Sequence, residues 1–145
     1  MGERIEFASN GDTAGGYLVR PASGTGPGIV VVQEWWGLDS GIKEMADRLG
    51  DAGFVAMVPD LYHGELAAHD EMDKAAQLMT QLPPDRAARD MSAAVDYLSG
   101  HEAVTGDALG VFQLISRRQY RSRRNRHIGL PLRTAADGSE QQNQD

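Results

Sequence analysis

A glutamate and two tryptophans follow a run of three valines and one glutamine in the segment "IVVVQEWWGL", residues 29–38. The valine run is typical of a strand that is buried on both faces, which places Glu34 at the strand's carboxyl end. A carboxylate there, close to the free N–H groups of the helix that follows, can orient a cation or a nucleophile. Spacing alone leaves a second interpretation open, in which Glu34 is a turn acid that caps the helix or pairs with an arginine.

Three strands are predicted before and up to this glutamate. Residues 4–9 and 16–21 form two short antiparallel strands, joined by a loop around Asn10-Gly11 that we expect to be longer than a two-residue turn. Residues 27–34, with their continuous apolar run, form a central parallel strand. The first two strands are therefore expected at an antiparallel edge of the sheet.

Apolar periodicity then predicts three helices and two further buried strands. The first helix is capped by Asp39 or Ser40 and ends near Gly53, and a strand over 54–62 follows, which Pro59 terminates. The next two helices cover residues 69–81 and 84–100, and the last strand covers residues 107–112. The helix over 84–100 has an expected apolar side made of Ala88, Met91, Ala94, Val95 and Leu98. The order β-β-β-α-β-α-α-β is that of an α/β layered sheet with crossover helices. Ligands of such sheets bind beyond the carboxyl ends of the parallel strands, where Glu34 is expected.

Composition narrows the class of protein. The 145 residues are 41% hydrophobic and 24% charged, as in a globular domain, and the net charge of -7 argues against a nucleic-acid binder overall. No run of 18 apolar residues and no secretion leader is visible, which makes the cytoplasm the expected location. The absence of cysteine excludes disulfides, cysteine-ligated zinc and a thiol nucleophile in these residues.

Residues 29–64, "IVVVQEWWGLDSGIKEMADRLGDAGFVAMVPDLYHG", resemble the dienelactone hydrolase family of α/β-hydrolases, which carries Q-E-x-x-G after the third strand and P-D-L-Y after the fourth. The resemblance extends through "MSAAVDYLSG" and "GDALGV" and covers about residues 1–111, the N-terminal half of the family's domain. It implies an incomplete α/β-hydrolase sheet. It also implies hydrolysis of a small-molecule lactone or carboxylic ester through an acyl-enzyme, with no cofactor and no metal.

Five residues are candidates for the site, and the resemblance assigns Glu34, Trp35, Tyr62 and His63 to it. Glu34 becomes the carboxylate that activates the nucleophile, and Trp35 supplies a backbone N–H to the oxyanion hole, where donors face the developing charge. Trp36 is expected to pack or to form a pocket wall. Tyr62 and His63 match the loop after the fourth strand and are expected to line a pocket, with no catalytic role assigned to His63.

The family places its nucleophile in a Gly-x-Cys-x-Gly or Gly-x-Ser-x-Gly elbow on the turn after the strand that "GDALGV" begins. Here the chain reads "VFQLISRRQY", and Ser116 has Leu114 and Arg118 where the glycines should stand. Neither His127 nor Asp137 lies in a recognisable triad motif. The chain is therefore expected to have little or no hydrolase activity.

Charge divides the chain after residue 112. Residues 1–112 carry 7 basic and 18 acidic side chains, whereas residues 113–145 carry 7 arginines and 3 acids. We expect the second part to be a disordered basic tail, and its loss of resemblance suggests the hypothesis of out-of-frame translation. The six arginines of residues 116–127 leave an alternative open, a nucleic-acid-binding or interaction protein. A sheet that ends at its nucleophile strand has an uncovered edge, which predicts poor solubility and self-association.

Overall fold

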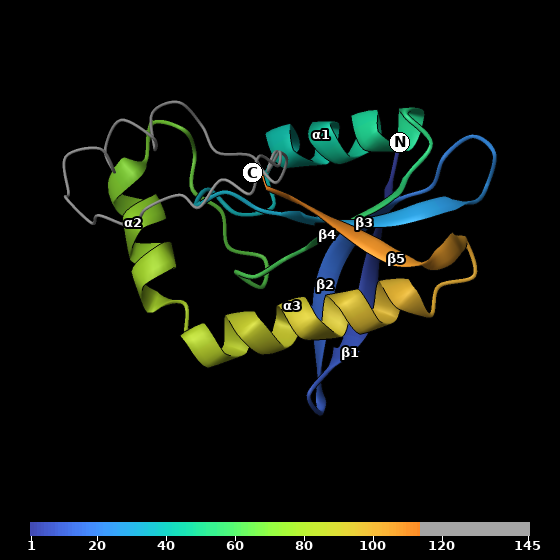
Figure 1. Ribbon diagram of the computed structural model, residues 1–145. Helices are drawn as coiled ribbons and strands as arrows, with labels where there is room; N and C mark the ends of the chain where they lie inside the picture. Colours follow the sequence, from blue (N-terminus) through green and yellow to red (C-terminus); the bar gives the residue numbers. More distant parts are fainter. Residues whose placement is uncertain (114–145) are drawn as a thin grey trace, which may run out of the picture. The chain divides into compact units, whose positions relative to one another are not determined.

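The computed structural model describes residues 1–113, and Figure 1 shows how their strands and helices are arranged. The elements are β1 (Glu3–Ser9), β2 (Asp12–Val19), β3 (Gly26–Val32), α1 (Ser40–Asp51), β4 (Val55–Pro59), α2 (Met72–Gln81), α3 (Pro84–Ser99) and β5 (Val104–Gln113). This order confirms the predicted α/β succession. The prediction that residues 107–112 are buried was wrong, because no residue of β5 is buried and most are exposed at the edge of the sheet. Ser116, His127, Asp137 and all predictions for the arginine-rich segment lie outside the described residues. A domain boundary after residue 112 stays a prediction.

The five strands form one mixed sheet with the order β1-β2-β4-β3-β5. β3 is parallel to both β4 and β5, whereas β2 is antiparallel to β1 and to β4. The prediction of a parallel β3 inside the sheet, with an antiparallel pair toward one edge, is confirmed. Figure 1 shows α1 and α3 on opposite faces of this sheet.

Two hydrophobic clusters cover the two faces, which explains the three successive valines. Val30 belongs to the cluster that includes Leu98 of α3, and Val31 belongs to the cluster that includes Ile42 of α1. Successive side chains of a strand point to opposite faces, so a strand with a helix on each side must be apolar at both kinds of position. Neither Val30 nor Val31 is exposed to solvent.

The turn between β1 and β2 corrects one prediction. Ser9 pairs directly with Asp12, so the hairpin loop is the two residues Asn10 and Gly11 and not a longer loop. Both have positive φ, 48° and 85°. Asn-Gly is the sequence that tolerates two left-handed residues in succession, and this turn lets β2 begin at Asp12, four residues before the predicted start.

The helices also depart from the predicted bounds and faces. Asp39 caps α1, since its Oδ1 accepts a hydrogen bond from the Ile42 N–H at 3.0 Å. α2 begins at Met72 and not at residue 69, because His69 is held by contacts outside the helix (below). On α3, Ala88 is exposed and Asp90 is buried, so the predicted apolar face was wrong at Ala88.

Among the described helices, none is both long and apolar enough to cross a membrane. The cytoplasmic location stays a prediction.

Candidate functional site

A tight turn carries the predicted site residues away from the end of β3. The Gly37 N–H donates to the Glu34 carbonyl at 3.1 Å, which leaves Trp35 and Trp36 at the two central positions. Gly37 has φ +97°, and a Cβ placed on it would lie 2.8 Å from the Glu65 carbonyl oxygen. A residue with a side chain would therefore be strained and would push against the neighbouring loop. We call residues 34–37 the Trp turn.

Gln33, the residue before this turn, connects the ends of β3 and β4. Gln33 is buried, and its Oε1 accepts a hydrogen bond from the Leu61 N–H at 3.0 Å, just after β4. The ends of β3 and β4 are thereby fixed next to each other. The sequence reasoning missed Gln33, although a glutamine that continues a buried apolar run is a sign that its amide has a specific partner.

Trp35 carries two hydrogen-bond donors that are unused within residues 1–113. No hydrogen bond among these residues takes its backbone N–H as the donor, and its indole Nε1 is buried without a partner. The ring meets Trp36 edge-on, with centroids 5.1 Å apart. The structure therefore places the Trp35 residue, half-buried, at the carboxyl end of the sheet with donors available for an acceptor.

Trp36 is held by a histidine from a distant segment. Its ring stacks on His69 with centroids 4.7 Å apart, and the His69 Nε2 lies 2.7 Å from Oδ2 of Asp39. The same Asp39 caps α1 through its other oxygen. The sequence reasoning missed His69, which it placed inside a helix.

Tyr62 and His63 are adjacent in sequence but have different partners. Tyr62 is buried, and burial raises the pKa of its phenol. Its Cδ2 lies 3.2 Å from the position of a Cβ on Gly37, so this ring packs against the Trp turn. The His63 Nε2, in contrast, lies 2.7 Å from Oδ2 of Asp90 on α3. Tyr62 therefore lies at the candidate site, and His63 joins the loop to the helix.

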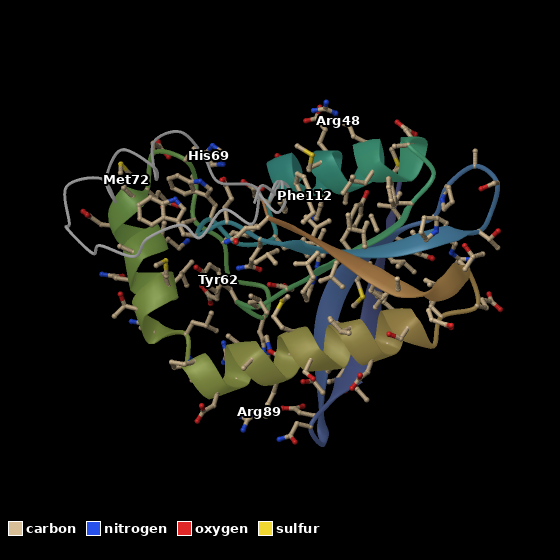
Figure 2. The ribbon with its side chains drawn as sticks, in the orientation of Figure 1. Arg48, Tyr62, His69, Met72, Arg89 and Phe112 are labelled. Atoms are coloured by element: carbon tan, nitrogen blue, oxygen red, sulfur yellow. The ribbon has the colours of Figure 1, made fainter. Side chains whose placement is uncertain are left out.

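We call residues 60–71 the β4–α2 loop, and Figure 2 shows its Tyr62 and His69 toward the side of the molecule where α2 lies. The Asp60 carboxylate accepts from the Tyr62 N–H at 3.2 Å and from the Gly64 N–H at 2.8 Å. Arg86 of α3 donates from Nη2 to the Leu61 carbonyl at 3.3 Å. Together these bonds fix the first half of the loop.

Within residues 1–113, no group of three or more histidines and acids is placed to bind a metal ion. A hollow of about 440 Å³ is found elsewhere, between the β1–β2 hairpin and α3, and none of its lining residues belongs to the Trp turn. Its lining residues are Ala8, Asn10, Arg89, Ser92, Ala93, Asp96 and Tyr97.

Known proteins are similar to this chain in sequence and in fold. The family model for the dienelactone hydrolase family matches residues 14–112. The chain is 40% identical over 117 residues to Protein usf of Aquifex pyrophilus, covering 77% of this chain and 49% of that protein. It is 31% identical over 124 residues to Carboxymethylenebutenolidase 1 of Cupriavidus pinatubonensis, covering 76% of this chain and 53% of that protein.

Solved structures are also similar to this chain in fold. The structure called m3DLH shares 31% identity and a TM-score of 0.64, over 78% of this chain and 48% of its own. A dienelactone hydrolase-like promiscuous phosphotriesterase from metagenomic libraries has 23% identity and a TM-score of 0.61, over 78% of this chain and 48% of its own, and shares the fold. The chain spans about half the length of the relatives named here. On the family match over most of its described residues, this chain belongs to the dienelactone hydrolase family.

Proposed function

We propose that the Trp turn is the charge-stabilising half of a site for hydrolysing small-molecule carboxylic esters or lactones. The observation that carries this proposal is the Trp35 backbone N–H, which has no acceptor among residues 1–113 and follows the carboxyl end of a central parallel strand. When a carbonyl carbon is attacked, negative charge develops on its oxygen. A fixed N–H donor stabilises that charge without any rearrangement at the moment of reaction.

Glu34 is proposed as the carboxylate that orients and activates the attacking group. It lies half-buried at the start of the Trp turn, one residue before the proposed donor. A carboxylate in such a position favours the deprotonated form of a neighbouring nucleophile when it accepts the proton or orients the base. Trp36 and Tyr62 are proposed as walls, because both rings pack around the same turn.

This chain is nevertheless proposed to have little or no turnover of its own. A nucleophile must sit on a sharp strand-to-helix turn, which the Gly-x-(Ser/Cys)-x-Gly sequence permits. The ten residues from 111 to 120, "VFQLISRRQY", contain no glycine and no cysteine, and their one serine lacks flanking glycines. Under this proposal the chain keeps the Trp35 donor that stabilises the charge and lacks the nucleophilic atom that attacks the ester.

Hydrolysis of an activated aryl ester by the full chain tests the proposed lack of turnover, and any turnover that is found tests the role of Glu34. We expect a rate equal to the background in buffer. The controls are Glu34→Ala and, as a matched exposed glutamate on α1, Glu44→Ala. Turnover that disappears only in Glu34→Ala would refute the inactivity and support the site. Turnover that both variants retain would refute the role of Glu34.

The coding DNA offers a separate test of the missing nucleophile. Reading the two other frames downstream of codon 111 should recover a Gly-x-(Ser/Cys)-x-Gly sequence if residues 113–145 arise from out-of-frame translation. Its absence from both frames would remove that hypothesis and leave the proposed site unaffected.

A further inference from the structure

Two histidine–aspartate pairs of the same geometry attach the β4–α2 loop to the rest of the molecule. His63 and His69 stand six residues apart on this loop, and in each case Nε2 lies 2.7 Å from an aspartate oxygen of another element. The remaining described histidine, His101, instead accepts a hydrogen bond from the Ala103 N–H at 3.1 Å. The paired arrangement is thus particular to this loop within residues 1–113.

The first pair joins the loop to α3. The Asp90 side chain is 5% exposed, and its two oxygens bind His63 and the Ser9 hydroxyl, the latter at 2.6 Å. The other charged groups near His63 are Asp60, whose carbonyl accepts the His63 N–H at 3.3 Å, and Arg86, which holds the neighbouring Leu61 carbonyl. His63 has φ +51°, an uncommon backbone conformation for a side chain of this size. The surrounding contacts must therefore hold it there.

The second pair joins the far half of the loop to the start of α1. His69 bridges Asp39 and the face of Trp36 and is 67% exposed at its side chain. The nearby charged groups on its own segment are Asp70 and Glu71, and Glu71 accepts the Ala68 N–H at 2.8 Å and pairs with Lys74 at 3.9 Å.

Between these two pairs the loop lies directly on the Trp turn. The Ala67 N–H donates to the Trp36 carbonyl at 3.0 Å, and the Glu65 carbonyl and Leu66 side chain fill the space beside Gly37. Any loosening of the loop therefore exposes the turn. Trp35 and Trp36 are the only tryptophans of the chain, so tryptophan fluorescence reports on this place alone.

We propose that the β4–α2 loop is a pH-dependent strap, which the His63–Asp90 and His69–Asp39 pairs hold closed over the Trp turn while the imidazoles are charged and release as that charge is lost. Imidazole is the side chain that changes charge between pH 5 and 8, where carboxylates stay ionised. A hydrogen bond between ionised partners is roughly twice as strong as a neutral one. Loss of the imidazolium charge weakens both attachments, whereas the backbone bonds of the loop carry no charge to lose.

This strap requires no turnover, so its test is independent of the hydrolase proposal. Acrylamide quenching of tryptophan fluorescence in the full chain, at pH 5.5 and pH 8.5, measures how accessible the Trp turn is. We expect the quenching constant to rise at the higher pH, because the neutral pairs hold the loop less strongly. The rise should disappear in the double variant His63→Gln, His69→Gln and persist in the matched control His101→Gln. Equal constants at the two pH values, or a rise that survives the double variant, would overturn the strap.

A second measurement covers the case in which the double variant does not fold. Hydrogen-exchange protection of the Ala67 amide, corrected for the intrinsic pH dependence of exchange, should fall several-fold between pH 5.5 and pH 8.5 in the unchanged chain, because local opening sets protection. The fall should be smaller in His69→Gln, whose substituted side chain is largely exposed. The Gly26 amide, bonded to the Ala103 carbonyl at 3.0 Å, serves as the control and should not change. Constant protection at Ala67 would contradict the proposal.

Discussion

Replacing Gly37 with alanine should separate the β4–α2 loop from the Trp turn. The new side chain carries two costs. A left-handed backbone at φ +97° costs a residue with a Cβ about 1–2 kcal/mol, and a Cβ that meets the Glu65 carbonyl at 2.8 Å and Leu66 Cδ2 at 3.0 Å adds about 1–3 kcal/mol of overpacking. The free energy of unfolding should fall by about 2–5 kcal/mol in total.

Gly64→Ala provides the matched control. Gly64 has nearly the same backbone angle, φ +94°, but a Cβ there meets nothing within 4 Å, so only the backbone cost applies. In urea denaturation with a slope of about 1.5 kcal/mol/M, the midpoint of Gly37→Ala should lie roughly 0.7–2 M below that of Gly64→Ala, because the two differ by the steric cost alone. Tryptophan emission should shift to longer wavelength only in Gly37→Ala, because only that variant displaces the loop from Trp36.

Equal midpoints for the two variants would show that a Cβ at position 37 does not meet the Glu65 carbonyl. The described contact between loop and turn would then be wrong. Failure of Gly37→Ala to fold while Gly64→Ala folds would agree with the reasoning, because the two differ only in the steric contact.

Two further predictions concern ionisation and association. Burial raises the pKa of Tyr62, so this tyrosine ionises at lower pH in the unfolded chain, near pH 10, and its contribution to stability is complete below that pH and lost above it. We therefore expect the free energy of unfolding to fall less steeply above about pH 10 in Tyr62→Phe than in the unchanged chain. Equal slopes in alkaline urea titrations would contradict this. No described strand pairs with the outer edge of β5, whose Leu109–Gln113 stretch has no charge and whose Val111 is 68% exposed. Unpaired edges of this kind promote association, so Val111→Lys should lower the mass of the assembly measured by sedimentation. Met72→Lys, at a comparably exposed site on α2, should leave that mass unchanged. A monodisperse unchanged chain with a cooperative thermal transition would refute the association.

The sheet could be predicted because its signals are local. Three successive valines indicate a strand covered on both faces, Asp39 marks the start of a helix, and the chain order of the elements then puts Glu34 at the carboxyl end of a parallel strand. The two-residue turn was missed although Asn10-Gly11 was seen, since a hairpin's length depends on strand register and not on its tip alone.

The sequence by itself thus determined the α/β order, the place of Glu34 and Trp35 at a strand end, and the family resemblance. Only the tertiary structure decided that Gln33 binds the Leu61 amide, that His69 stacks on Trp36, and that Asp90 is buried between His63 and Ser9. Each of these contacts joins residues at least 27 apart in the chain. Periodicity reports which side of an element is apolar, whereas the partner of a polar side chain depends on which element lies opposite, and packing of the whole sheet sets that.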